Sequence, residues 1–315
     1  MNVYHGLAAF ERLPHAVVTS GTFDGVHVGH QKILARLRER ADANGGQTVL
    51  LTYWPHPRLV LRPDDRALRL LSTLEEKTHR LARFGVDHLI IIPFTRDFSR
   101  LSSETFIRKV LVEGIGTGTL VIGYDHRFGR NREGSFEHLR EHAPTWGFAV
   151  EEIPRQDVDD VGVSSTKVRQ ALLEGRVSLA NEYLGDPYPL TGTVVRGEQR
   201  GRQIDFPTAN LAVAEPHKLI PAEGVYAVRA GPADAPAYRW AGMMNIGRRP
   251  TVGTSQERSI EVHLFDYTGD LYGQTLRVGL VDLIRAERRF EGMEALRRQL
   301  ERDRTVIRDR LARYS

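Results

Sequence analysis

The hydrophobic period changes once along this chain, and the change limits the folds that the chain can adopt. Up to about residue 185, short apolar runs alternate with stretches that have helical spacing. Such alternation is typical of parallel strands in a doubly wound α/β sheet. Beyond that point, strand-like runs follow one another without helices between them, which favours a small antiparallel barrel. We therefore expect two domains, residues 1–185 and 186–315, and the length of 315 residues also favours two.

Each half has its own set of expected elements. Strands of the first half are expected at Ala16–Thr19, Thr48–Tyr53, His88–Pro93, Leu120–Gly123 and Ala149–Ile153. Its helices are expected at about Gln31–Ala43, Leu74–Phe84, Ser103–Leu111 and Phe136–Glu141. Strands of the second half are expected at Leu190–Val195, Gly224–Arg229, Trp240–Asn245, Ser259–Asp266 and Leu276–Leu283. A closing helix is predicted from apolar residues at helical spacing, which are Phe290, Met293, Leu296, Leu300, Ile307 and Leu311.

Composition excludes several classes of chemistry. The chain has no cysteine, which rules out disulfides, thiolate catalysis and cysteine-ligated zinc. The most apolar short run, Leu89–Ile92, is far below the ~20 residues that span a bilayer. No early segment has a basic start followed by a long apolar run, so we expect no signal peptide, no membrane partner and a cytoplasmic location.

The charge balance suits phosphorylated ligands better than nucleic acid. The pI is near 9.4, but the formal net charge is only +4. Much of the arginine is interleaved with acidic residues, as at residues 36–40 and 297–304. Such mixed patterns predict solvated helix faces, and no aromatic residues alternate with a basic stripe as they do in single-strand binders. We therefore expect no nucleic acid partner.

A glycine-rich turn with the sequence G-T-F-D-G-V-H-V-G-H connects the first expected strand to the first expected helix. Backbone N–H groups and the positive end of a helix meet in such a turn, and phosphate binds there. His27 and His30, three positions apart, can reach the same anion; the ordinary alternative is a pair of capping or core histidines. The candidate site residues of this turn are Gly21, Phe23, Asp24, Gly25, His27, Gly29 and His30.

A second anion motif, V-S-S-T-K-V-R at residues 163–169, closes the first half. Ser164 is a plausible N-cap, with Val168 and Leu172 on the buried face and Gly175 past the helix end. Alone, this is an ordinary capped helix with surface charge. Together with the histidine turn it fits nucleotidylyl transfer, which needs in-line positioning and charge stabilisation rather than a protein nucleophile. The candidate residues are Ser164, Ser165, Thr166 and Arg169.

Over nearly its whole length the chain resembles the prokaryotic bifunctional riboflavin kinase/FAD synthetase family. Gly21–His30 and Ser164–Arg169 match the family's adenylyltransferase motifs, which implies a Rossmann-like nucleotidylyltransferase domain. The intermediate motifs match Phe94, Phe98, Phe106–Ile107 and the segment Gly123–Gly129. The resemblance implies that FMN binds near Asp125 and Phe128, although Asp125 also suits a capping or turn carboxylate. His126 stands where the family usually has phenylalanine.

The second half has a dense cluster between Gly192 and Leu211. Its glycines allow a close approach of the backbone to a ligand. Thr208 and Asn210 offer neutral oxygen ligands two residues apart on an extended segment, and Mg²⁺ takes such oxygens together with water and phosphates. Taken alone, Pro207–Asn210 is more typical of a turn.

The resemblance favours the metal-site interpretation of this cluster. The segment matches the flavokinase motif G-R-x-x-G-F-P-T-A-N-L, which implies that Thr208 and Asn210 bind the metal ion. Asp205 stands where the family normally has glycine; it could repel ATP or lie outside the site, and the sequence leaves both open. The substrate-binding residues implied here are Gly197, Gly201, Arg202 and Pro207.

The expected strand Ile260–Leu264 alternates, with Glu261 and His263 on one side. The pattern alone makes Glu261 a solvent-side residue. The resemblance implies instead that Glu261 is the base that accepts the 5′-hydroxyl proton of riboflavin. It also implies that Arg285 lies near the substrates, while Phe290 could equally belong to the core.

The sequence thus predicts an enzyme with two ATP-dependent reactions. One converts riboflavin to FMN and releases ADP; the other converts FMN to FAD and releases pyrophosphate. ATP, riboflavin and FMN are the expected small-molecule partners, with Mg²⁺ as cofactor, and an oligomer is possible. Two other classes were weighed: a lone nucleotidylyltransferase with the barrel as a binding module, and a non-enzymatic flavin or nucleotide sensor. Glu261, Thr208 and Asn210 argue against the first, and the second predicts lost catalytic groups, of which only Asp205 is a candidate.

Overall fold

The computed structural model describes residues 1–65, 67–123, 127–130, 133–153, 162–197, 201, 204–248 and 258–314. Contacts divide the chain into two compact units, unit 1 (Met1–Ser165) and unit 2 (Thr166–Ser315). Helix α8 (Val177–Leu184) packs on two strands of unit 2. The buried Asn181 of this helix donates to the carbonyl groups of Leu280 (2.8 Å) and Val281 (3.1 Å). The division therefore falls earlier in the chain than the change of hydrophobic period at residue 185.

Unit 1 is built on a six-stranded sheet in the order β1-β4-β3-β2-β5-β6, in which every neighbouring pair is parallel. The strands are β1 (Asn2–His5), β2 (Ala16–Ser20), β3 (Thr48–Trp54), β4 (His88–Pro93), β5 (Thr117–Gly123) and β6 (Ala149–Ile153). The doubly wound sheet expected from the sequence is confirmed. Only the edge strand β1 was not predicted, because its four residues mix polar and apolar side chains without a buried run.

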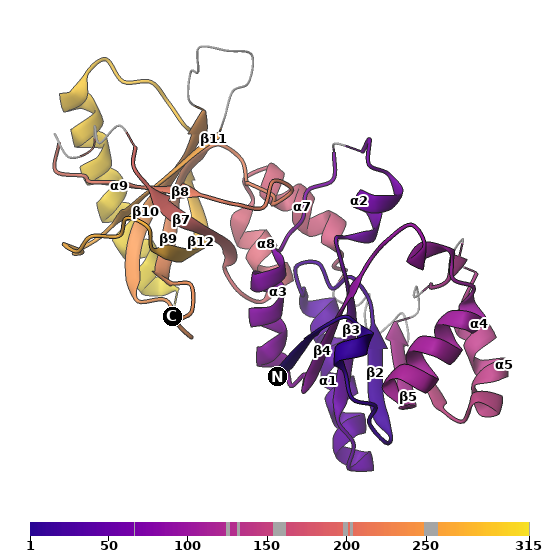
Figure 1. Ribbon diagram of the computed structural model, residues 1–315. Coiled ribbons are helices and arrows are strands. Elements are labelled where there is room, and N and C mark those ends of the chain that lie inside the picture. The colour runs from indigo at the N-terminus through magenta and orange to yellow at the C-terminus, as the bar shows by residue number, and fades with distance from the viewer. Residues whose placement is uncertain are drawn as a thin grey trace. The chain divides into compact units, whose positions relative to one another are not determined.

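Helices cover both faces of this sheet (Figure 1). They are α1 (Val28–Asn44), α2 (Pro57–Leu61), α3 (Leu74–Leu81), α4 (Ser103–Phe106), the π-helix η4 (Ile107–Ile115) and α5 (Phe136–Trp146). Short 3-10 turns lie at η1 (Leu7–Ala9), η2 (Ala82–Phe84) and η3 (Phe98–Arg100). Neighbouring residues of a strand lie on opposite faces of the sheet and belong to different hydrophobic cores. Leu50 belongs to the core that includes residues of α1 and α3, and Leu51 to the core that includes residues of η4 and α5. Two covered faces explain why the strands are apolar runs rather than alternating ones.

Two helices of unit 1 continue well past their predicted carboxyl ends. Helix α5 continues past Glu141 and through Pro144 to Trp146. Trp146 packs against the hydrophobic core, and Gly147 then ends the helix in the left-handed conformation, so packing overrides the helix-breaking tendency of proline. The helix expected to end at Leu111 changes to a π-helix and reaches Ile115, which is fully buried.

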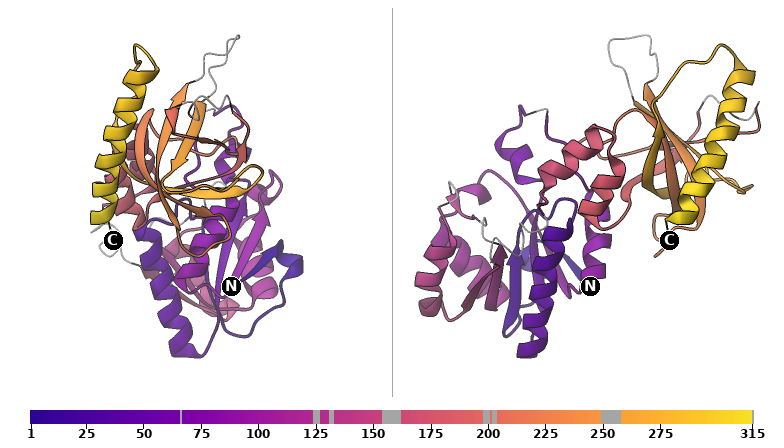
Figure 2. Two further views of the ribbon diagram at one scale, coloured as in Figure 1. Left: turned by 90° about the vertical axis from the view of Figure 1, so that its left-hand side faces the viewer. Right: turned by 180° about the vertical axis from the view of Figure 1, so that it is seen from behind.

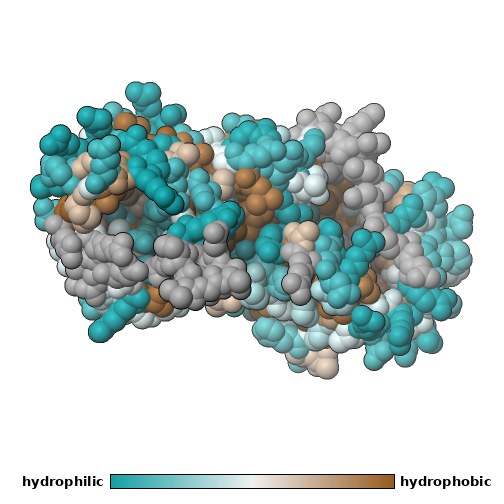
Figure 3. Space-filling model, turned by 90° about the horizontal axis from the view of Figure 1, so that it is seen from above, coloured by the Kyte–Doolittle hydropathy of each residue, from teal (hydrophilic) through white to brown (hydrophobic). Residues whose placement is uncertain are grey.

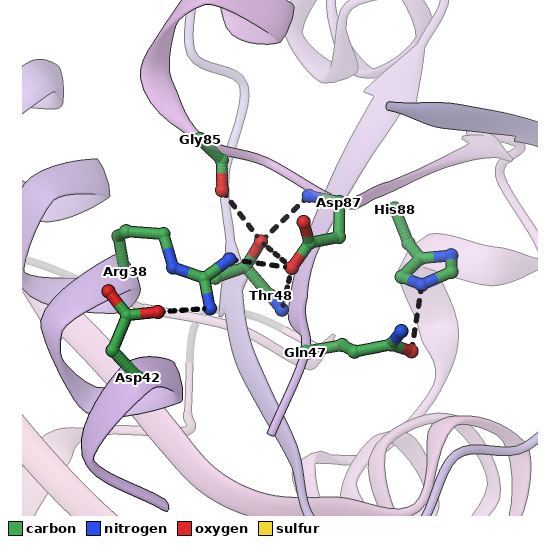
Figure 4. A network of polar contacts seen from close by, with 7 residues as sticks. All are labelled: Arg38, Asp42, Gln47, Thr48, Gly85, Asp87 and His88. Atoms are coloured by element: carbon green, nitrogen blue, oxygen red, sulfur yellow. Dashed lines mark hydrogen bonds and ion pairs between the residues drawn. The ribbon is translucent and has the colours of Figure 1, made fainter. Parts of the chain in front are cut away.

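A polar network fixes the amino ends of the central strands (Figure 4). The Asp87 carboxylate accepts hydrogen bonds from the Thr48 backbone N–H (2.9 Å) and from Arg38 (2.8 Å). Thr48 Oγ1 donates to the Gly85 carbonyl at 2.9 Å. His88, 7% exposed, pairs its Nε2 with Gln47 Oε1 at 3.1 Å. This network joins α1 to the starts of β3 and β4, at the edge of the sheet away from the loops that carry the site.

The strand order creates a switch point beside β2. The chain runs from β2 to β3 and β4 on one side, then returns to place β5 on the other side of β2. In open α/β sheets, ligands bind at the carboxyl ends of the strands, at the point where the winding direction reverses. The turn that follows β2 therefore lies at the expected ligand position of unit 1.

Unit 2 is a closed antiparallel barrel in the order β10-β11-β8-β7-β12-β9. Its strands are β7 (Tyr188–Val195), β8 (Ala209–Ala212), β9 (Gly224–Pro232), β10 (Trp240–Arg248), β11 (Arg258–Leu264) and β12 (Thr275–Arg285). Helix α9 (Met293–Arg313) lies along the barrel (Figure 2). The predicted barrel and closing helix are confirmed, with two corrections: the helix begins at Met293 and leaves Phe290 outside, and strand β8 was not predicted. Helix α7 (Ser165–Leu173) precedes α8, with Val168 and Leu172 fully buried as expected.

The face drawn in Figure 3 is mostly hydrophilic, with hydrophobic residues in separate patches. Among the described residues, the large exposed apolar side chains include Leu61 (53% exposed) on α2 and Val306 (49% exposed) on α9. Apolar side chains scattered singly over a surface are normal and indicate no interface. Within the described ranges, no helix is long and apolar enough to cross a membrane.

Candidate functional sites

The turn between β2 and α1 has a strained backbone. Phe23 has φ 45° and Val26 has φ 42°, while Gly25 between them has φ 83°. A positive φ is uncommon for any residue except glycine, and for a β-branched valine it is an outlier. Such strain persists only where the surroundings fix the conformation, and it concentrates at functional sites.

The contacts that hold this turn in its strained conformation come from the segment that precedes α3. The Asp24 carboxylate accepts backbone hydrogen bonds from Leu71 (3.0 Å) and Ser72 (3.1 Å). The Gly25 N–H in turn donates to Ser72 Oγ at 3.1 Å. Asp24 is only 3% exposed. Its carboxylate therefore holds the turn through the backbone of residues 71 and 72.

His27 and His30 form a stacked pair at the start of α1. His27 is the N-cap of the helix, and its Nδ1 accepts the His30 backbone N–H at 3.3 Å. The ring proton of neutral His27 is therefore on Nε2. The two ring centroids are 3.7 Å apart, with Phe23 packed on His30 at 4.8 Å.

Burial keeps His30 neutral. Its Nδ1 is buried and has no hydrogen-bond partner within the described ranges. Burial is the main reason that the pKa of His30 lies well below its usual value, and the nearby His27, Lys77 and Arg80 lower it further. A neutral imidazole in this position binds an anion through N–H donation and without a charge of its own.

A hydrogen bond joins the motif at residues 163–169 to the histidine turn. Ser165 Oγ donates to the Asp24 carbonyl at 3.0 Å, a contact between residues 141 positions apart. The exposed Ser164 precedes it. Thr166 and Arg169 lie on α7, in the part of the chain that the contacts assign to unit 2.

The residues implied in FMN binding are described only in part. Asp125 and His126 lie outside the described residues. Phe128 is 7% exposed and packs on Phe106, with ring centroids 5.5 Å apart. Further rings continue this row to the carboxyl ends of β3 and β4, through Phe98, Phe94 and Tyr53. An aromatic row of this kind offers a flat apolar surface that begins at the carboxyl ends of β3 and β4.

In unit 2, a pocket of about 410 Å³ lies between the barrel and α9. Glu261 and His263 of β11 line it together with Met243 and Asn245 of β10. Its other lining residues are Gly201, Ile204, Phe206, Thr208, Val225, Arg285, Glu287, Arg288, Phe290, Met293, Leu296 and Leu300. The prediction that Glu261 and His263 share a face agrees with this lining, and that face borders the pocket.

A second pocket of about 330 Å³ is lined by the opposite face of β11, including Val262 and Leu264. The D-L-Y stretch at residues 270–272 forms another wall. Thr208 lines both pockets. Thr208 therefore lies between the two pockets, where groups held in each can approach one another.

Three oxygen-bearing side chains meet beside Thr208. Its Oγ1 donates to Glu261 Oε2 at 3.1 Å. Glu261 lies opposite Asn210 in the register of β11 and β8. A Cβ on Gly197 would lie 2.1 Å from Asn210 Nδ2, so a larger residue at this position would displace the amide. Hydroxyl and amide oxygens next to a carboxylate are the donor set that Mg²⁺ prefers.

The surroundings of Asp205 bear on whether its carboxylate could repel ATP or lies outside the site. Asp205 has φ 62°, a left-handed conformation that glycine adopts without cost and aspartate tolerates. Its side chain is 82% exposed and pairs with Arg297 at 3.7 Å. It lines neither of the two pockets within the described ranges. Among the described residues, this carboxylate is therefore exposed, and its ion-pair partner is Arg297 of α9.

Arg285 is held from α9. Its Nε and Nη2 both lie 2.9 Å from Asp303 Oδ2, and Gln299 donates to the other carboxylate oxygen at 2.7 Å. Asp303 is 2% exposed. The prediction of a solvated helix face at residues 297–304 is therefore wrong at this position, because Asp303 is buried and its carboxylate requires a charged partner. Phe290 precedes α9 and lies under Arg285 and Arg288 at 5.6 and 4.9 Å.

Sequence reasoning did not single out Lys77, His263 or Asp303. His263 Nδ1 donates to the Pro207 carbonyl at 2.8 Å and so fixes the segment before Thr208. Lys77 is 2% exposed, below the histidine turn. Its position among the apolar residues Leu74 and Leu81 was the signal available for it, since a lysine on a buried helix face needs partners. Arg202 lies outside the described residues.

A parallel sheet with a glycine-rich histidine turn at its switch point, and a barrel with a hydroxyl and a carboxylate in contact, fit a two-part phosphate-group transferase. A family model for FAD synthetase matches residues 10–167, and one for riboflavin kinase matches residues 184–311. The chain belongs to the family of bifunctional riboflavin kinase/FMN adenylyltransferases.

Relatives of this name match over most of their length. The Listeria monocytogenes protein is 38% identical over 91% of this chain and 90% of its own. The Escherichia coli protein is 37% identical over 98% of this chain and 97% of its own. A crystal structure described as that of a macrolide-efflux protein from Streptococcus pneumoniae is 30% identical, with a TM-score of 0.87 over 98% of this chain and 99% of that one.

Proposed function

We propose that the two reactions of this bifunctional enzyme are divided between the two halves of the chain. In this proposal, residues 1–185 adenylylate FMN to FAD, and residues 186–315 phosphorylate riboflavin to FMN. The observation that carries the proposal is that each unit has its own cluster of polar groups suited to phosphate: the histidine turn in unit 1 and the contact between Thr208 and Glu261 in unit 2. The matches of the two family models to different parts of the chain support it.

In adenylylation, a phosphate oxygen of FMN attacks the α-phosphorus of ATP, and pyrophosphate leaves. The proposed role of the turn is electrostatic. His27 and His30 donate N–H bonds to the phosphates, and the glycine-rich backbone from Gly21 to Gly29 adds donors at the helix end. Because the contacts with residues 71 and 72 fix this turn beforehand, the donors need no reorganisation during the reaction.

The remaining members of this site are assigned from the family motifs. Ser164, Ser165, Thr166 and Arg169 are proposed to neutralise the leaving pyrophosphate. The hydrogen bond from Ser165 to the turn supports this role for the start of that motif. Asp125 and Phe128 are proposed to hold FMN, and the aromatic row through Phe106 supports an isoalloxazine site there.

In the kinase reaction, Glu261 is proposed to accept the proton of the riboflavin 5′-hydroxyl as that oxygen attacks the γ-phosphorus of ATP. The mainly apolar pocket beside Glu261 suits the flavin ring, and the pocket on the other side of Thr208 suits the nucleotide. Arg285 is proposed to orient the substrates, held by Asp303. The glycines at 197 and 201, with Arg202 and Pro207, are proposed to bind the nucleotide phosphates.

We also propose that Mg²⁺ binds at Thr208 and Asn210. The Thr208 hydroxyl and the Asn210 amide supply neutral hard oxygens, and the substrate phosphates would supply the charge that holds the ion. When bound, Mg²⁺ neutralises charge on the phosphates during transfer. Asn210→Ala should raise the Mg²⁺ concentration needed for half-maximal FMN synthesis without affecting pyrophosphate release from supplied FMN.

The test of the proposed function resolves ATP consumption by product. Riboflavin and ATP should give ADP first and pyrophosphate later, whereas supplied FMN and ATP should give pyrophosphate alone. Glu261→Gln should suppress ADP formation from riboflavin and leave pyrophosphate release from supplied FMN unchanged. His30→Ala should suppress pyrophosphate release from supplied FMN and leave ADP formation from riboflavin unchanged. Loss of both ADP formation from riboflavin and pyrophosphate release from supplied FMN in either variant would show that the two reactions share one site.

A further inference from the structure

Lys77 of α3 is buried directly below the histidine turn, and the proposed chemistry leaves it unused. Its side chain is 2% exposed, which is rare for a lysine. The ammonium group donates to the Thr22 carbonyl at 2.8 Å and to Thr52 Oγ1 at 3.4 Å. It also lies 5.5 Å from the centre of the Trp54 ring.

The hydrogen bond to Thr22 is one of several that hold the strained turn in place. Residues 71 and 72 hold Asp24 and Gly25, and Lys77, one helical turn later, holds the carbonyl of Thr22. Helix α3 starts with a capping box between Thr73 and Glu76, which fixes the position of Lys77. The segment from Leu71 to Lys77 therefore holds the turn by hydrogen bonds at Thr22, Asp24 and Gly25.

The charge of Lys77 also acts on this site. The Asp24 carboxylate of the turn raises the pKa of Lys77, and the charge of Lys77 lowers the pKa of His30 on α1. Arg80, on the same helix as Lys77, also faces His30. Burial lowers the pKa of Lys77 to about 8, despite the carboxylate of Asp24. The ammonium form is thus the main form at neutral pH and is lost at mildly alkaline pH.

We propose that Lys77 is a positioning residue for FMN adenylylation: its ammonium group holds the Thr22 carbonyl and places a buried positive charge beneath the phosphate-binding turn. The proposal rests on the assignment of His27 and His30 to the adenylylation site. A buried cation at this depth strengthens anion binding because little solvent screens it. It also keeps the turn in the strained conformation that aims the histidines and the N–H groups.

The experiment uses the full-length chain and measures pyrophosphate release from FMN and ATP between pH 6.5 and 9.5. The variants are Lys77→Met, which removes the charge, and Lys77→Arg, which keeps a charge that does not titrate in this range. Lys109→Met is the matched control, an exposed lysine of the same unit. Riboflavin kinase activity and thermal unfolding are recorded on the same samples.

The wild-type kcat/KM for ATP is expected to fall above about pH 8, as Lys77 loses its proton. Lys77→Met should reduce adenylylation at pH 7.5 by roughly 10²-fold, as expected for the loss of a preorganised charge, and should show no further fall above pH 8. Lys77→Arg should keep measurable activity and also lack the alkaline fall. Lys109→Met should match the wild type, and kinase activity should be unchanged throughout.

Two results would overturn the proposal: adenylylation by Lys77→Met within about threefold of the wild type, since a positioned charge contributes far more, or the same alkaline fall in both Lys77 variants. If Lys77→Met does not fold, the pH profile of Lys77→Arg decides alone. The underlying site assignment fails separately, if His30→Ala keeps full adenylylation, whatever the Lys77 variants show.

Discussion

The proposed phosphate sites of the two units are built from different chemical groups. The proposed site of unit 1 combines N–H donors of a strained turn, a neutral histidine at the helix start and a buried cation, Lys77. Unit 2 places the Thr208 hydroxyl beside the Glu261 carboxylate, and an amide lies on the neighbouring strand. A site of donors and cations neutralises phosphate by itself, whereas a site of oxygens requires a metal ion to do so.

The two aspartates beside these sites show the same contrast. Asp24 is 3% exposed and accepts backbone N–H groups, so it fixes the turn. Asp205 is 82% exposed and forms only an ion pair with Arg297 at the surface, among the contacts that the structure describes. The same residue type therefore fixes the site structure in unit 1 and leaves it unaffected in unit 2. Burial and hydrogen bonding decide the difference, and the sequence motif alone does not.

The largest effect is expected from His30→Ala. Loss of a preorganised donor costs roughly 10²–10³ in rate, or about 2.7–4 kcal/mol. FAD formation from supplied FMN should fall by this factor, while ADP release with riboflavin stays near the wild-type rate. The measurement is product-resolved ATP turnover.

The control is His142→Ala, which replaces an exposed histidine of the same unit and should change neither rate. Equal losses of both activities in His30→Ala would contradict the separation of the sites.

Glu261→Gln tests the proposed kinase site of unit 2. This change keeps the shape and removes the charge, and a positioned base usually contributes at least about tenfold. FMN synthesis should fall by at least that factor, with adenylylation of supplied FMN unchanged. Flavin binding, followed by fluorescence, should persist because the pocket is otherwise intact.

Glu182→Gln, at an exposed position on α8, is the matched control. Near-normal kinase turnover in Glu261→Gln would make Glu261 an ordinary residue at the edge of the pocket.

The fold was predictable where periodicity alone determines structure. β4 has the ends expected from the sequence, and the change from a parallel sheet to a barrel follows from the loss of helical spacing after residue 185. Helix α5 shows the limit, because Trp146 packs on the core and carries the helix through Pro144. Tertiary packing of this kind is not encoded in local pattern.

The candidate sites were predictable where residues act through a turn or a strand face. The pairing of Ser165 with the Asp24 carbonyl, and of Thr208 with Glu261, joins motifs that the sequence presents separately. Lys77 and Asp303 were not found, since each looks like one charge among many on a helix. Their roles depend on burial against a distant carbonyl or guanidinium, which only the folded chain shows.

A smaller effect is expected on the free energy of unfolding, which acid should lower through the buried histidines. Burial lowers the pKa of His30 and His88 in unit 1, and of His263 in unit 2, below the ordinary value of 6.5. The unfolded chain then binds more protons than the folded one, so the free energy of unfolding falls as the pH drops below about 6.5. The slope is at most about 1.4 kcal/mol per pH unit for each histidine.

Denaturant unfolding between pH 7.5 and 5 measures this effect, with Trp54 and Trp146 as fluorophores of unit 1 and Trp240 as that of unit 2. Unit 1 should lose more stability because it contains two of these histidines. His88→Gln, which can keep the contacts with Tyr4 and Gln47, should reduce the slope for unit 1 only. Equal slopes in the variant and the wild type would assign the acid sensitivity to other groups.

The smallest effect is expected from Asp205→Gly, which restores the residue usual at this position in the family. Glycine adopts the observed φ of 62° without strain, and an exposed ion pair such as that with Arg297 contributes only about 0–1 kcal/mol. These two changes oppose each other, so kinase kcat/KM for ATP should stay within about twofold of the wild type. The matched change in unit 1, Asp24→Gly, should abolish most adenylylation, because it leaves the backbone N–H groups of residues 71 and 72 without the buried carboxylate. A large gain in ATP affinity in Asp205→Gly would instead mean that this carboxylate repels the nucleotide, and the contrast between the two aspartates would no longer hold.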